Sequence, residues 1–163
     1  MPRIVLVHPQ IPPNTGNIAR TCAATRTELH LVCPLGFGIG DRDLRRAGLD
    51  YWPYVPLKVH QSFDHFRYYW KQYGGRWIGF SARAQADYSK LSYVQNDWLL
   101  FGSETTGLPP EILASCTATV RIPMIESRIR SLNLSVSATI GLFEAQRQLE
   151  TEAVSIGVCD GWI

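Results

Sequence analysis

The sequence lacks the residue spacings that mark metal-binding proteins. Its four cysteines are Cys22, Cys33, Cys116 and Cys159. No two of them form a CxxC pair, and the four histidines form no HExxH pattern. Because zinc sites depend on such spacings, we expect no bound metal, reduced thiols and a cytoplasmic location.

Long apolar runs and a strong charge of one sign are also missing. No hydrophobic stretch reaches the roughly 20 residues that a bilayer-spanning helix needs, so we expect no membrane segment. The first residues lack the apolar core of a secretory signal peptide. The net charge is only +2, which does not indicate a nucleic-acid-binding protein, so that function would have to be argued from local arginine clusters.

What the sequence does contain is a composition that can bury a core. The chain has 163 residues, of which 45% are hydrophobic and 18% charged. This length and composition predict one folded domain over residues 1–150, followed by a tail at 151–163 without a clear pattern.

Apolar runs and helical spacings alternate along the chain. The runs predict strands at residues 4–7, 29–33, 55–59, 77–80, 98–101 and 119–122. Helical spacings and capping residues predict helices at residues 16–25, 43–47, 63–73 and 132–149, with a short one after Pro109-Pro110. Such alternation predicts an α/β fold in which helices flank a mostly parallel sheet. Parallel sheets bind ligands at the carboxyl ends of their strands, where three loops here are rich in Gly, Ser, Asn and Pro.

The first of these loops follows the first predicted strand and reads IPPNTGNIART. Its two prolines are expected to exclude regular structure, so that Asn14 or Thr15 caps the first helix. The backbone amides, with Asn14 and Asn17, would then lie at a helix start that favours anions. Arg20 lies one turn beyond Gly16 and can face the same side. The alternative is a capped helix with a surface arginine.

The second loop reads LLFGSETTGLP. Gly102 and Gly107 allow either a tight turn or close approach of the backbone to a ligand. Glu104 could accept hydrogen bonds from a ligand or from neighbouring amides. The loop lacks the Lys-Ser/Thr of a phosphate-binding P-loop, and no GxGxxG follows the first strand, so a nicotinamide site is not indicated.

The third loop leads into the last predicted helix and reads RIPMIESRIRSLNLSVS. It carries Arg128 and Arg130, and the polar residues Asn133, Ser135 and Ser137 then interrupt an otherwise apolar helix. Such residues indicate either a binding site or a helix cap with small residues for close packing.

In this order, the loops resemble the SPOUT superfamily of trefoil-knotted RNA methyltransferases over about residues 3–149. The matching motifs are NTGNIART, FGSETTGLP and IPM…SLNLSVS, with RRAGLDYW between the first two. The short chain is similar to the members that methylate the ribose 2′-hydroxyl of the wobble cytidine or uridine in leucine tRNAs. The stretch between IPM and SLNLS is about one residue longer than in the family pattern.

The resemblance implies a deep C-terminal trefoil knot and a homodimer with the first and last helices at its interface. It also implies that S-adenosylmethionine, the methyl donor, binds bent within the knot, largely to backbone groups. The donor-binding residues implied by the resemblance are Phe80, Gly102, Ile122, Ser131 and Leu132.

The resemblance also assigns the RNA side of the site, with Arg20 as the catalytic residue. A guanidinium stays protonated, so we expect Arg20 to stabilise charge on the 2′-oxygen or to hold the adjacent phosphate. The expected tRNA contacts are Asn14, Asn17, Arg42, Arg45, Arg46 and Asn133. For the arginine patch, with the rings of Tyr51 and Trp52 nearby, a solvated helix face is the alternative.

Two other functions stay open from the sequence. The first is a SPOUT enzyme that acts on ribosomal RNA, which the lack of an added RNA-binding domain disfavours. The second is a module that binds S-adenosylmethionine and RNA without transferring the methyl group, which only a transfer assay can distinguish.

Overall fold

The computed structural model of the chain describes residues 1–38 and 52–155. Its centre is a seven-stranded sheet in the order β3-β2-β1-β6-β4-β7-β5, and all neighbouring strands pair in parallel. The strands are β1 (Arg3–Val7), β2 (Leu29–Val32), β3 (Leu57–His60), β4 (Trp77–Phe80), β5 (Ala86–Asp87), β6 (Trp98–Phe101) and β7 (Ala118–Arg121). The predicted α/β fold with a parallel sheet is therefore confirmed.

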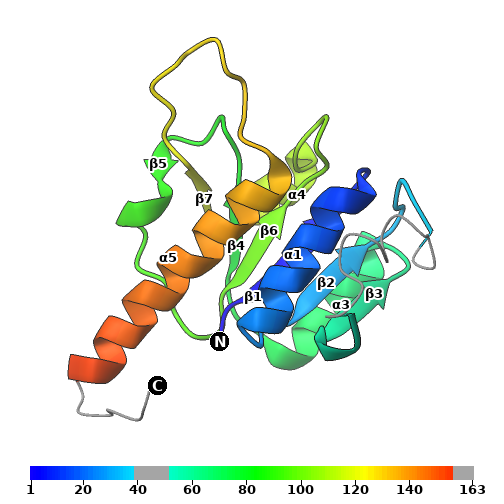
Figure 1. The fold of residues 1–163 in the computed structure, drawn as a ribbon, viewed down its shortest axis with the longest axis horizontal. Coiled ribbons are helices and arrows are strands. Elements are labelled where there is room, and N and C mark those ends of the chain that lie inside the picture. Colours follow the sequence, from blue (N-terminus) through cyan, green and yellow to red (C-terminus); the bar gives the residue numbers. More distant parts are fainter. Residues whose placement is uncertain (39–51, 156–163) are drawn as a thin grey trace.

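Helices cover both faces of this sheet. They are α1 (Pro12–Ala24), α3 (Phe63–Tyr73), α4 (Pro110–Ser115) and α5 (Leu134–Ser155), with 3-10 turns η1 (Trp52–Tyr54) and η2 (Tyr88–Lys90). Helices α1 and α5 lie side by side on one face, while α3 and α4 lie on the other (Figure 1). Both α1 and α5 begin near the carboxyl edge of the sheet (Figure 1).

The continuous apolar runs reflect burial on both sides of each central strand. In β1, Ile4 and Leu6 belong to the core under α1 and α5. Val5 and Val7 belong to the core that includes Phe66 of α3. A strand covered on both faces needs apolar residues at every position, which is why the runs do not alternate with polar residues.

The start of α1 differs from the sequence-based expectation. The helix begins at Pro12, and Ile11 is the N-cap residue without a side-chain hydrogen bond. Asn14 and Thr15 therefore lie inside the helix instead of capping it. The first turn of a helix tolerates proline for two reasons. The N–H groups of that turn have no intrahelical acceptor, so nothing is lost when proline lacks one, and the proline ring already holds φ near the helical value.

The boundaries of α3 agree with the prediction. The Ser62 hydroxyl accepts a hydrogen bond from the backbone N–H of His65, and the helix ends at Gly74, whose φ is 64°. Helix α5 runs beyond its predicted end at residue 149 to Ser155. The two-residue strand β5 was not predicted, since it has no apolar run. The division into a domain at 1–150 and a tail stays a prediction.

The close packing of α5 on the sheet depends on Gly141. A Cβ atom at this position would lie 2.6 Å from Cζ of Phe80 and 3.3 Å from Cζ of Phe101. The glycine lets α5 approach these two rings, which are stacked with centroids 4.5 Å apart. The knotted threading that the resemblance implies for this part of the chain stays a prediction.

Candidate active site

Three of the expected donor-binding residues come from neighbouring strands. Strands β6, β4 and β7 are adjacent in the sheet. Phe80 is the last residue of β4, Gly102 follows β6, and Ile122 follows β7. Phe80 is also paired in register with Val120. The structure therefore brings these residues together at the carboxyl edge, where parallel sheets bind their ligands.

Gly102 and Gly107 close a tight turn directly after β6. The backbone N–H of Gly107 donates to the carbonyl of Ser103 at 2.9 Å, and Gly107 has a φ of 73°. A Cβ atom on Gly102 would lie 1.9 Å from the carbonyl carbon of Gly107 and 2.0 Å from the nitrogen of Leu108. Only glycine fits at position 102, because the turn folds back onto it.

The ring of Phe80 takes part in packing at this edge. It is 8% exposed, and it stacks on Phe101 beneath Gly141 of α5. A ligand at the end of β4 would therefore contact mainly the backbone and the ring edge of Phe80. By contrast, Ser131 is exposed and Leu132 half-buried, in the long loop that joins β7 to α5 and projects beyond the sheet (Figure 1).

Glu104 connects the turn after β6 to the start of α1. Its carboxylate accepts hydrogen bonds from the backbone N–H of Gln10 at 2.8 Å and that of Ile11 at 3.2 Å. It accepts a third from Nδ2 of Asn14 at 3.0 Å. Of the two alternatives that the sequence left open for Glu104, the structure shows hydrogen bonds to neighbouring amides.

Asn14 extends this connection to α5. Its Oδ1 accepts a hydrogen bond from Nδ2 of Asn133 at 2.9 Å. Oδ1 of Asn133 in turn accepts from the backbone N–H of Ser135 at 2.8 Å and from the Ser135 hydroxyl at 2.7 Å. The chain Glu104–Asn14–Asn133, which we call the carboxyl-edge network, thus joins all three of the polar loops. Sequence spacing could not reveal it, because its two hydrogen bonds join residues that lie 90 and 119 positions apart.

The carboxyl-edge network changes the interpretation of the α1 start. We expected free backbone amides there that would attract an anion. Gln10 and Ile11 instead donate to Glu104, Pro12 and Pro13 have no N–H group, and the N–H of Asn14 donates to the carbonyl of Ile11 at 3.1 Å. The anion at this helix start is the protein's own carboxylate.

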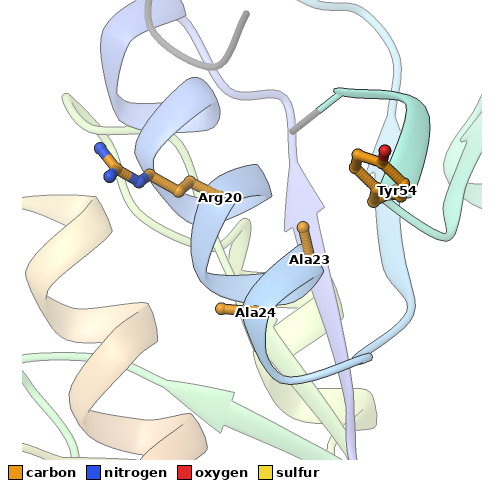
Figure 2. Close-up of a pocket in the computed structure, with 4 residues that line it drawn as sticks. All are labelled: Arg20, Ala23, Ala24 and Tyr54. Carbon is orange, nitrogen blue, oxygen red and sulfur yellow. The ribbon is translucent and has the colours of Figure 1, made fainter. Parts of the chain in front are cut away.

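Arg20 lies further along α1 with an exposed side chain. It lines an open hollow of about 360 Å³ together with Ala23, Ala24 and Tyr54 of η1. Figure 2 shows that the guanidinium points away from the Tyr54 ring. Tyr54 is 73% exposed, and the small alanines between the two side chains leave the hollow open.

The remaining expected RNA contacts are only partly described. Asn17 is exposed on α1, one turn before Arg20. Arg42, Arg45 and Arg46 lie outside the described residues, as does the predicted helix at 43–47. Whether Asn17 and the three arginines contact RNA stays a prediction.

Arg128, in the loop before α5, pairs with Glu126 at 2.7 Å. The hydrogen bonds from Arg128 lower the pKa of the Glu126 carboxyl to about 2. Both side chains are exposed in this loop, where ion pairs contribute little to stability. The pair therefore contributes little to the stability of the loop.

A second group of titratable residues lies on the α3 face. Nδ1 of His30 in β2 is 2.9 Å from Nε2 of His60 in β3, and both rings are buried. Burial lowers the pKa of both to about 4, assisted by the neighbouring ring of His60 for His30 and by His65 for His60. Across residues 1–38 and 52–155, no three His, Cys, Asp or Glu side chains could together hold a metal ion. No helix in the same ranges could cross a membrane.

With this geometry in view, the chain can be compared with known proteins. A protein from Synechocystis sp. (strain PCC 6803), named provisionally as a tRNA (cytidine(34)-2′-O)-methyltransferase, is 57% identical over 151 residues, which cover 93% of this chain and 99% of the relative. A solved structure described as "Structural insights into the 2-OH methylation of C/U34 on tRNA" matches with a TM-score of 0.88 and 46% identity, covering 93% of this chain and 97% of the other.

A more distant structure contains a bound methyl donor. It is the SpoU methyltransferase AviRb from Streptomyces viridochromogenes in complex with AdoMet, with a TM-score of 0.85 and 25% identity over 93% of this chain and 61% of that one. The model of the SpoU rRNA Methylase family matches residues 1–143, which include the whole carboxyl-edge network. By these matches and by its fold, the chain belongs to the SpoU methylase family.

Proposed function

We propose that the chain transfers a methyl group from S-adenosylmethionine to the ribose 2′-hydroxyl of the wobble nucleotide, position 34, of tRNA. One observation carries the proposal. The turn after β6, at the edge that also holds Phe80 and Ile122, is hydrogen-bonded to the start of the helix that carries Arg20, in a chain that aligns almost end to end with relatives named for this reaction.

The residues at this edge fit the methyl donor. The tight turn that Gly102 permits holds the backbone after β6 at this edge, and Ser131 and Leu132 lie in the loop that follows β7. The donor supplies an electrophilic methyl group on a sulfonium. The chain would hold adenine and methionine through loop amides and carbonyls around Ile122 and exclude water with the ring edge of Phe80.

Arg20 would act on the acceptor. The hollow beside it is open to solvent, and the exposed guanidinium is accessible to a ribose or phosphate group of a bound nucleotide. The guanidinium remains protonated and is suited to stabilise negative charge on the 2′-oxygen or to hold the neighbouring phosphate in two parallel hydrogen bonds. Positioning the two reactants would supply much of the remaining acceleration.

We also propose that the chain works as a homodimer through α1 and α5, in the cytoplasm where tRNA is modified. The two helices pack together on one face, and α5 leaves Val136 and Phe143 about half exposed, at 47% and 53%. These residues are seven apart and so lie on one side of the helix. Light scattering during size exclusion should give twice the chain mass, and Phe143→Glu should reduce it to that of one chain.

Ribosomal RNA is the second candidate substrate, since the matching family model carries the words rRNA Methylase. Donor with a labelled methyl group, purified protein, and either total tRNA or ribosomal RNA would distinguish the two. We expect label in tRNA, with mass mapping placing it on the ribose of nucleotide 34. Label confined to ribosomal RNA would replace the tRNA assignment, and no label in either RNA would leave a non-catalytic binding module.

A further inference from the structure

We propose that Glu104 and Asn14 are positioning residues that hold Arg20 in register with the donor-binding turn. This inference rests on the proposed function. Neither side chain is needed to contact a reactant, because each acts through the element that it fixes. The carboxyl-edge network joins α1, the turn after β6 and the start of α5.

Glu104 sits on the donor side of this connection. It lies two residues after Gly102 and within the turn closed by Gly107, so the turn fixes its backbone. Its carboxylate then binds two main-chain N–H groups and one side-chain amide at the α1 start. Three hydrogen bonds to one charged acceptor define a position more tightly than a single neutral bond does.

The helix transmits this position to the acceptor side. Arg20 follows Asn14 by six residues, which is about 9 Å along a helix axis. An intact helix of this length moves as one body, so a shift of its first turn is also a shift of Arg20. Misplacing a catalytic group by about 1 Å can cost roughly a hundredfold in rate.

Asn14 links the two other members, and both ends of its amide are used. The nitrogen donates to Glu104 and the oxygen accepts from Asn133, while only 6% of the residue is exposed. We expected Asn14 and Asn133 to contact tRNA. Since the amide of Asn14 is occupied within the protein, the geometry assigns it to positioning instead.

The defined polarity of the Asn14–Glu104 hydrogen bond allows a test by reversal. In Asn14→Asp, two carboxylates face each other at about the present 3.0 Å, and in Glu104→Gln the charged acceptor is lost. In the double variant Asn14→Asp/Glu104→Gln, the new amide at position 104 can donate to the new carboxylate at position 14, while its oxygen still accepts from the backbone N–H of residue 10. The N–H of residue 11, which shares Oε1 of Glu104 with Asn14 in the parent chain, loses its acceptor, so the recovery is expected to be partial. Asp64→Asn, an exposed carboxylate change on α3, is the matched control.

For each variant we would measure Tm, the calorimetric affinity for S-adenosylmethionine, and kcat and KM for tRNA. Each single variant should lower kcat roughly tenfold or more. The double variant should recover kcat at least about fivefold over the less active single variant, because groups in one hydrogen-bond network do not act independently. Asp64→Asn should match the parent chain. A merely structural role would change Tm without restoring kcat in the double variant.

Single variants that keep kcat within twofold of the parent chain's would overturn the inference. A double variant that has the parent's Tm and donor affinity, but only the kcat of the less active single variant, would also overturn it. If a single variant does not fold, the double variant is compared with the parent chain, and a folded double variant whose kcat is roughly a hundredfold or more below the parent's would overturn the inference. Failure of the proposed function looks different, since the parent chain itself would then methylate no tRNA.

Discussion

The two polar clusters of this molecule are built in opposite ways. The carboxyl-edge network joins three loops near the surface and binds an ionised carboxylate through amides. The histidine pair His30–His60 lies on the α3 face, inside a shell of aromatic rings that includes Phe66, Tyr69 and Trp98. The first cluster is built from hydrogen bonds to a carboxylate, whereas in the second burial keeps the two rings neutral by lowering the pKa of each.

This difference predicts that the carboxyl-edge network serves the reaction and that the histidine pair serves the stability of the fold. A network that holds a charge between loops can align groups that act on a ligand, and its loss should affect rate first. A buried neutral pair belongs to the core, so its perturbation should affect stability first. Each of the following predictions changes one region and leaves the other as the control.

The largest effect is expected at the carboxyl edge, from Arg20→Ala. Removing a charge that stabilises the reacting oxygen should lower kcat/KM roughly a hundredfold or more, while Tm changes little, because Arg20 is exposed. Methyl transfer to tRNA and thermal unfolding measure the two effects. Arg67→Ala on α3 should leave transfer unchanged. Near-complete activity of Arg20→Lys would show that bidentate hydrogen bonding by the guanidinium is not required.

The next largest effect belongs to the histidine pair and appears in stability against pH. The unfolded histidines bind protons near pH 6.5, whereas the folded pair does so only near 4. Between these values the unfolded state binds more protons, so stability falls as the pH is lowered through this window, by about 3 kcal/mol for His30 alone.

Urea unfolding at intervals from pH 7 to 4 measures this dependence. His60→Gln removes one titrating ring and should flatten the curve, with methyl transfer at pH 7.5 retained. A free energy of unfolding that stays constant down to pH 5 would contradict the buried neutral pair.

A smaller effect is expected from Gly102→Ala at the donor turn. The added methyl group must displace the backbone of Gly107, and overpacking of this kind costs about 1–3 kcal/mol, so donor affinity should fall roughly tenfold. Calorimetry with S-adenosylmethionine measures it. Gly38→Ala is the matched control, since a Cβ atom there meets nothing within 4 Å. Equal donor affinity in both variants would remove the turn from the donor site.

The smallest effect lies on the α3 face. Ser62→Ala removes the hydroxyl that accepts from the His65 N–H and should lower stability by about 1 kcal/mol. Chemical denaturation provides the measurement, and methyl transfer should match that of the parent chain. A loss of transfer without a loss of stability would mean that the two faces are not independent.

The central strands were predictable because their composition leaves no alternative. Trp77–Phe80 and Trp98–Phe101 form strands at the predicted residues, since four consecutive, mostly large apolar residues between turn-forming ones suit a strand buried on both faces. The predicted start of α1 was wrong, because adjacent prolines break the interior of a helix but are accepted in its first turn.

The site was predictable in its parts but not in its connections. The ends of three strands had to meet once the sheet was parallel, so Phe80, Gly102 and Ile122 could be expected at one edge. The partners of Glu104 could not, because a carboxylate can accept from a ligand or from an amide, and only the fold decides which lies nearer. The tRNA-facing arginines remain predictions from the resemblance.

The two prolines that open α1 have one further consequence. Each ring limits φ to a narrow range even in the unfolded chain, so the first turn loses little backbone entropy when it forms. The start of α1, the helix that carries Arg20, is thus ordered before a nucleotide binds, and ordering it takes little from the free energy of binding. Replacing Pro12 and Pro13 by alanine should then weaken the affinity for RNA more at high temperature than at low.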